Sequence, residues 1–161
     1  RSNTTNEAEL VTEIITKRVP LVNQYAYAGY LTGYQDQEYI DQLPKIPFDS
    51  EDDPNFRYMA FEMKGNSMDD GSRDSYIEGD KLFCQEIPLH MWDTSKLHTM
   101  NWNFVIVYKK GIIVRKIIDH DIQNRTIVAH PLNPFINDEL INLVDVYQIF
   151  NVIEYQRKTR R

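Results

Sequence analysis

Short runs of apolar and β-branched residues, separated by turn residues, dominate the chain from residue 56 onward. Runs of this length that are bounded by glycine, asparagine or aspartate are typical of strands. They predict strands at Tyr58–Met63, Lys81–Ile87, Phe104–Tyr108, Ile112–Ile118, Thr126–Ala129 and Val146–Tyr155. Lys109-Lys110-Gly111, which separates two of these runs, predicts a hairpin. The pattern therefore predicts a mostly β domain.

The first third of the chain follows a different pattern. Apolar residues recur at helical spacing from Leu10 to Ile15, which predicts a helix that ends before Pro20. A tyrosine-rich, irregular stretch follows, with a short helix predicted at Gln37–Gln42. The tyrosines lack interleaved basic residues, so we expect them to pack against the domain rather than to stack on nucleic acid bases. Residues 1–53 are interpreted as an N-terminal arm and linker, and residues 54–161 as the folded domain.

Composition narrows the class of protein. The 161 residues suit one domain, and a net charge of -6 disfavours direct contact with a phosphate backbone. The single cysteine, Cys84, excludes an internal disulfide and a cysteine-based zinc site. No apolar run is long enough to span a membrane, so we expect a cytoplasmic protein without a membrane partner. We predict no metal, and we expect His120, between two aspartates, to lie in a solvated turn.

Ser67 is the first candidate for chemistry. It lies in Gly65-Asn66-Ser67-Met68, directly after a predicted strand. Gly65 would let another chain approach closely, and the amides of Ser67 and Met68 are candidates for an oxyanion hole. A serine hydroxyl still needs a base, because it is a poor nucleophile at neutral pH. Taken alone, this motif is a weak signal and is far more often a serine in a β-turn.

The serine motif belongs to an ordered series. The series consists of Ala28-Gly29, Gly65-Asn66-Ser67-Met68, Glu78-Gly79-Asp80, the strand that starts at Gly111, and Leu132-Asn133-Pro134-Phe135. In this order the motifs resemble the LexA-type autopeptidase family, which includes LexA, lambda-type phage repressors and the UmuD-like proteins. The resemblance covers roughly residues 19–154.

The resemblance implies a fold and a set of roles. The fold would be a LexA- or signal-peptidase-like domain of bent antiparallel sheets with an N-terminal arm. Ser67 would be the nucleophile, and Ala28-Gly29 would be the scissile bond, carried on a loop that enters the protein's own active site. Asp80 and Asn133 would shape turns rather than take part in the chemistry.

The chain departs from the family at the general base. The family uses a lysine on the strand after the hairpin, but the residue in register here is Arg115, and Lys116 follows it. Neutralising a lysine at pH 7 costs roughly 5 kcal/mol, whereas neutralising an arginine costs roughly 9 kcal/mol. Arg115 therefore cannot act as the base. Lys116 can act only if the strand bulges by one residue, because neighbouring side chains point to opposite faces.

These observations predict the C-terminal regulatory domain of a prophage-like transcriptional repressor, a homodimer of the SOS-response type. Its helix-turn-helix, which would contact operator DNA, would lie upstream of this chain. Self-cleavage would be stimulated by a RecA–single-stranded DNA filament and impaired by Arg115. A UmuD-like polymerase accessory protein and a catalytically dead dimerisation module are the alternatives. We expect no cofactor and no small-molecule ligand, and we expect the terminal strand, Val146–Tyr155, to form the dimer edge.

Overall fold

The structure is a computed structural model that describes residues 14–51 and 55–159. Strands dominate these residues, which confirms the prediction of a mostly β fold. The nine strands of the described residues are β1 (Ile14–Val22), β2 (Lys45–Glu51), β3 (Tyr58–Glu62), β4 (Lys81–Glu86), β5 (Asn103–Tyr108), β6 (Gly111–Asp121), β7 (Thr126–His130), β8 (Glu139–Asn142) and β9 (Val146–Gln156). The helices are α2 (Tyr27–Gly33), α3 (Gln37–Gln42) and α4 (Met91–Thr94), with short 3-10 turns at Gln24–Ala26, Leu97–Met100 and Leu143–Asp145.

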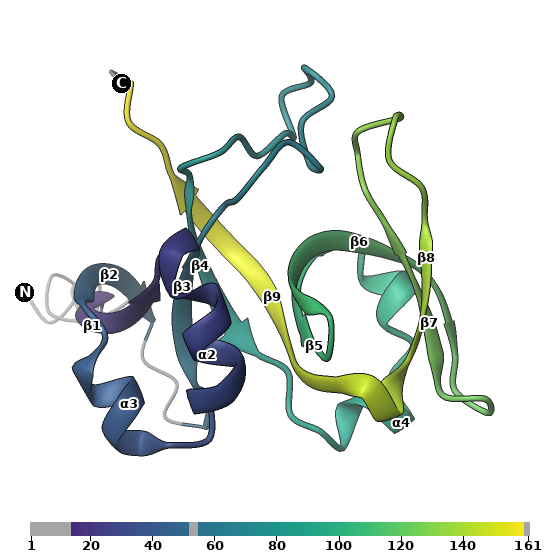
Figure 1. Ribbon diagram of the computed structural model, residues 1–161, viewed down its shortest axis with the longest axis horizontal. Coiled ribbons are helices and arrows are strands. Elements are labelled where there is room, and N and C mark those ends of the chain that lie inside the picture. Colours follow the sequence, from purple (N-terminus) through teal and green to yellow (C-terminus); the bar gives the residue numbers. More distant parts are fainter. Residues whose placement is uncertain (1–13, 52–54, 160–161) are drawn as a thin grey trace, which may run out of the picture.

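The strands form one continuous, strongly bent sheet. Its order is β2-β1-β3-β4-β9-β5-β6-β7-β8, and every neighbouring pair is antiparallel except β1 and β3. Figure 1 shows β9, in yellow, running diagonally between the group of β1 to β4 and the group of β5 to β8. The long β9 thus joins the two halves of the domain.

The N-terminal segment is part of this sheet. The helix predicted before Pro20 is wrong over its described part, because Ile14 and Ile15 begin β1; Leu10 and Val11 lie outside the described residues. β1 pairs with β2 along its length and with β3 at its end, so pairing between distant segments overrides the local helical spacing. The short helix predicted at Gln37–Gln42 is confirmed as α3.

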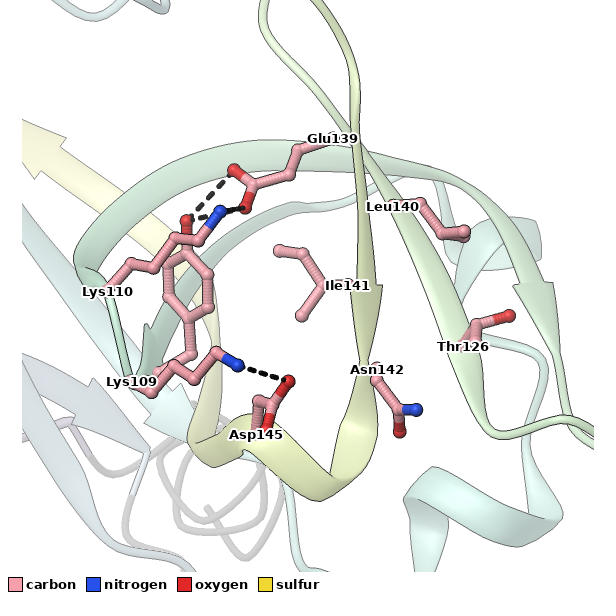
Figure 2. Close-up of a pocket in the computed structure, with 9 residues that line it drawn as sticks. Lys109, Lys110, Thr126, Glu139, Leu140, Ile141, Asn142 and Asp145 are labelled. Atoms are coloured by element: carbon pink, nitrogen blue, oxygen red, sulfur yellow. Dashed lines mark hydrogen bonds and ion pairs between the residues drawn. The ribbon is translucent and has the colours of Figure 1, made fainter.

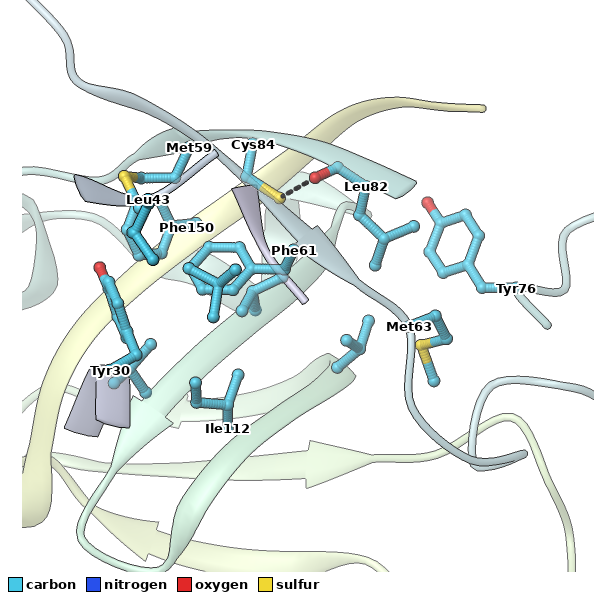
Figure 3. Packing of buried hydrophobic residues seen from close by; sticks show 14 of the residues in the cluster. Tyr30, Leu43, Met59, Phe61, Met63, Tyr76, Leu82, Cys84, Ile112 and Phe150 are labelled. Carbon is cyan, nitrogen blue, oxygen red and sulfur yellow. Dashed lines mark hydrogen bonds between the residues drawn. The ribbon is translucent and has the colours of Figure 1, made fainter. Parts of the chain in front are cut away.

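Most tyrosines of the N-terminal segment pack against the domain, as predicted, but Tyr25 is 91% exposed and does not. Tyr30 on α2 is fully buried, and its ring meets that of Phe61 edge to face with centroids 5.6 Å apart. Phe61 in turn contacts Phe150 of β9 at 5.1 Å. Figure 3 shows these rings among the apolar side chains of β3, β4, β6 and β9. The segment that we interpreted as an arm therefore contributes to the main core.

The terminal strand β9 lies inside the order of the sheet rather than at its end, and the expectation that it forms a dimer edge stays a prediction. β9 pairs with β4 on one side and with β5 on the other. Only Phe150 and Asn151 are paired on both sides, whereas residues 152–156 pair with β4 alone and have no described strand on their other side. The outer strands of the described sheet are β2 and β8.

The solvated turn predicted at His120 is also wrong. His120 lies on β6 with its side chain buried, and its Nδ1 accepts a hydrogen bond of 3.0 Å from the Leu97 amide. Burial lowers the pKa of His120. Between its flanking aspartates the strand continues, so the ring points inward as alternation requires.

None of the helices that the structure describes is long and apolar enough to cross a membrane.

Candidate active site

Ser67 lies in a turn that follows β3 and is held in place from two sides. Gly65 enters this turn with a positive φ of 79°, a conformation that favours glycine, and its amide donates to Glu78 Oε1 at 2.9 Å. From the other side, the Asn133 amide donates to the Ser67 carbonyl at 3.0 Å, and Asn133 Nδ2 donates to the Asn66 carbonyl at 3.1 Å. The backbone of the serine is thus positioned by a segment 66 residues away.

Asp80 stabilises the same turn through hydrogen bonds to the segments next to it. Its carboxylate is 1% exposed and accepts from the Ile77 amide at 2.9 Å and from Arg157 Nε and Nη2 at 2.8 and 2.7 Å. The Asp80 carbonyl accepts from the Met63 amide at 2.7 Å, which ties the turn to the end of β3. The structure thus places both Asp80 and Asn133 in contacts that shape turns.

Arg115, on β6, faces Ser67. Its Nη1 donates to Ser67 Oγ at 2.8 Å and to the carbonyl of Val114 at 2.8 Å. The β5–β6 pairing runs without a shift from Tyr108 and Gly111 to Asn103 and Lys116. Lys116 therefore points to the opposite face of the sheet from Arg115.

The irregularity in β6 does not rescue Lys116. The pairing of β6 with β7 shifts between Ile117 and Asp119, which lies beyond Lys116. A one-residue bulge at that point changes the direction of the side chains that follow it, not of those that precede it. The condition under which Lys116 could reach Ser67 is therefore not met.

The contact with Arg115 fixes what Ser67 can do. Burial lowers the pKa of Arg115, while Tyr108 and Glu139 act in the opposite direction. A guanidinium starts so far above neutral pH that it remains charged, and it has donors but no acceptor. Ser67 Oγ accepts this hydrogen bond, and no side chain of the described residues accepts a hydrogen bond from it. The site therefore holds a candidate nucleophile without a base.

A pocket of about 320 Å³ opens beside these two residues. It lies between the turn that carries Ser67 and the first half of β6. The residues that line it are Tyr27, Lys64, Gly65, Asn66, Ser67, Ile112, Ile113, Val114, Arg115 and Ile136. β7 pairs with β6 only from Lys116 onward, so residues 112–115 have no described strand on that side. The pocket is therefore bordered by an open strand edge.

The expected scissile bond lies near this pocket but in a helix. Ala28 and Gly29 are exposed and belong to the first turn of α2. Tyr27, the residue before them, lines the pocket, and its hydroxyl donates to the Glu62 carbonyl. An open strand edge pairs with an extended chain, so α2 would have to unwind before this bond could lie along β6.

Met68 is buried, and its carbonyl accepts from the Tyr76 amide at 2.8 Å.

A second pocket, of about 280 Å³, was not anticipated from the sequence. It lies between the β5–β6 hairpin and β8 (Figure 2). Its charged groups are paired with one another: Glu139 accepts from the Tyr108 hydroxyl at 2.9 Å, and Lys109 lies 3.1 Å from Asp145. Burial and Glu139 raise the pKa of Tyr108 to about 12. With its charges neutralised internally, this pocket offers no free reactive group.

Comparison with known proteins leaves the family open. No protein-family model matches the sequence, and no curated protein matches it. Among residues 14–51 and 55–159, no group of three or more histidine, cysteine or carboxylate side chains could hold a metal ion.

Proposed function

We propose that this chain is the C-terminal regulatory domain of a prophage-like transcriptional repressor of LexA type, in which self-cleavage is disabled. The observation that carries the proposal is the 2.8 Å hydrogen bond from Arg115 Nη1 to Ser67 Oγ. It gives the position expected for a catalytic base to a residue that cannot accept a proton.

Three features favour a peptidase-like origin for the site. The serine lies on a rigid turn with a left-handed glycine two residues before it. Strand β6 places a cationic side chain, that of Arg115, against the serine hydroxyl, which is where a serine–lysine pair would have its lysine. The open edge of β6 beside the pocket suits an extended peptide, which would add to the sheet as a strand.

The same geometry argues against turnover. Deprotonating an arginine near neutral pH costs about 9 kcal/mol, which is close to seven orders of magnitude in the fraction of neutral base. The charged guanidinium also holds a lone pair of Ser67 Oγ, which lowers its nucleophilicity. The domain would then act by binding and dimerisation, and the acidic surface fits the half of a repressor that does not touch DNA.

Restoring the base tests this proposal. The chain, Arg115→Lys, Arg115→Gln and the double variant Ser67→Ala/Arg115→Lys are incubated between about pH 7 and pH 10, and intact mass is followed over time. We expect Arg115→Lys to cut itself between Ala28 and Gly29 at least about 100-fold faster than the parent, with the rate rising with pH. Arg115→Gln removes the guanidinium without supplying a base, so it should remain intact, as should the double variant.

Two results would contradict the proposal. Efficient cutting of the parent chain that is lost on Ser67→Ala would mean that a base is present. Failure of Arg115→Lys to cut at any pH, with a folded protein by circular dichroism, would mean that the site is not a peptidase site with one missing group.

A further inference from the structure

Only one of the three nitrogens in the Arg115 guanidinium donates hydrogen bonds to described residues. Both protons of Nη1 are engaged, one by Ser67 Oγ and one by the Val114 carbonyl. Nε and Nη2 donate to no residue that the structure describes, although Arg115 lines the pocket. These two nitrogens form the edge of a guanidinium that matches the two oxygens of a carboxylate.

The pocket also carries a surplus of positive charge. Lys64 lines it and is exposed, with its ammonium 5.9 Å from the centre of the Tyr27 ring. Glu139 acts on Arg115 at longer range but is already bound by the Tyr108 hydroxyl and by Lys110. Glu78, next to the turn, is held by the Gly65 amide. The protein has a net charge of -6, yet this pocket is lined by two cationic side chains and by no carboxylate.

The unpaired strand edge next to Arg115 indicates that a carboxylate bound there would belong to a peptide. The Val114 carbonyl accepts from Arg115 on the side away from β5. Backbone groups two residues apart in a strand point the same way, so Ile112 presents its amide and carbonyl to the same side. β7 does not reach this part of β6. An extended peptide can therefore pair with Ile112 while its end reaches Arg115.

We propose that this pocket binds the C-terminal carboxylate of an extended peptide chain. The carboxylate bridges Nε and Nη2 of Arg115, with Lys64 adding a second positive charge. The preceding backbone pairs with Ile112, and a small apolar side chain lies against Ile113 and Ile136, which also line the pocket. This inference rests on the proposed function, because it takes the pocket as a retained peptide-binding cleft. Arg115, which stands in the place of the base, would then bind the end of a peptide chain.

The test compares one peptide with and without its terminal charge. N-acetyl-alanyl-tyrosyl-alanine, as the free acid and as the C-terminal amide, is titrated into the ¹⁵N-labelled intact chain. The readout is the arginine Nε–H resonances, with that of Arg115 assigned by its loss in Arg115→Lys. Because two charge-assisted hydrogen bonds are lost in the amide, we expect the acid to bind about 10- to 100-fold more tightly and to shift the Arg115 signal.

Matched variants and anions complete the experiment. Arg115→Gln should abolish the preference for the acid, and Lys64→Gln should weaken binding of the acid by a few fold. Lys109→Gln removes the same charge from the other pocket, where its partner is Asp145, and should leave binding unchanged. Acetate and inorganic phosphate separate recognition of a peptide end from recognition of any anion.

The outcomes are distinct. Equal binding of acid and amide, or unchanged preference in Arg115→Gln, overturns the inference. Acetate or phosphate binding as tightly as the peptide acid also overturns it, since the strand edge would then contribute nothing. Intact mass is checked after each titration: self-cleavage of the parent chain would refute the proposed function without altering the comparison of acid with amide.

Discussion

Replacing Arg157 with alanine should destabilise the protein by about 2–3 kcal/mol. Arg157 donates two hydrogen bonds to the Asp80 carboxylate, which is 1% exposed. Leaving a buried charge without its partner costs about 3–5 kcal/mol. The Arg157 side chain is 33% exposed, so water can reach the vacated position, and we place the cost at or just below the lower limit of that range. Of the groups that the structure describes, only the Ile77 amide would then still donate a hydrogen bond to the carboxylate.

Urea unfolding measures this cost. With a slope of about 2 kcal/mol per molar for a protein of this size, the midpoint should fall by roughly 1 M. Arg157→Lys keeps the charge but loses the two-pronged contact, so its midpoint should lie between those of the parent and Arg157→Ala. The cycle with Asp80→Asn should show coupling of about 1–2 kcal/mol. A loss below about 0.5 kcal/mol in Arg157→Ala would refute the role of this pair in holding the turn beneath Ser67.

Three further substitutions test other parts of the account. Asn133→Ala removes the bonds from Nδ2 to the Asn66 carbonyl and from the Phe135 amide to Oδ1, and should cost about 1–2 kcal/mol in urea unfolding; an unchanged midpoint would contradict this. Gly33→Ala brings a Cβ to 2.7 Å from the Tyr39 ring and should cost about 1–3 kcal/mol, a loss that Tyr39→Ala in the same chain should largely relieve. Burial lowers the pKa of His120, so the unfolded chain takes up its proton first and stability should fall as pH drops below about 6.5. His120→Gln should flatten this dependence between about pH 7 and pH 5, and an unaltered slope would assign it to other groups.

The sequence predicts best those elements that carry their own local pattern. The strands from Tyr58 onward, except β8, are predicted because each is a compact apolar run bounded by turn residues; β8 is only four residues long and its two apolar residues lie between a charged and a polar one, so it carries no such run. β1 was mistaken for a helix because its apolar residues also fit helical spacing, and only pairing with β2 and β3 decides between the two. α2 was missed because tyrosines and two glycines are poor helix formers, and burial of Tyr30 compensates for this.

At the site, the family resemblance and strand alternation together placed one residue but not its surroundings. The resemblance put Arg115 at the position of the base, and alternation left Lys116 as an alternative only if the strand bulged; the β5–β6 hairpin runs without a bulge, and Arg115 contacts Ser67. The helical state of Ala28-Gly29 and the central place of β9 depend on contacts between distant segments, which no local pattern encodes.

The reactivity of Ser67 shows whether a base is available to its hydroxyl. The parent chain, Arg115→Lys and Arg115→Gln are incubated with a fluorophosphonate at alkaline pH, and the modified residue is located by peptide mass. We expect Ser67 to become labelled in Arg115→Lys and to stay unlabelled in the parent and in Arg115→Gln, because only lysine can take the proton from its hydroxyl. Labelling of Ser67 in the parent at the rate seen for Arg115→Lys would contradict this expectation.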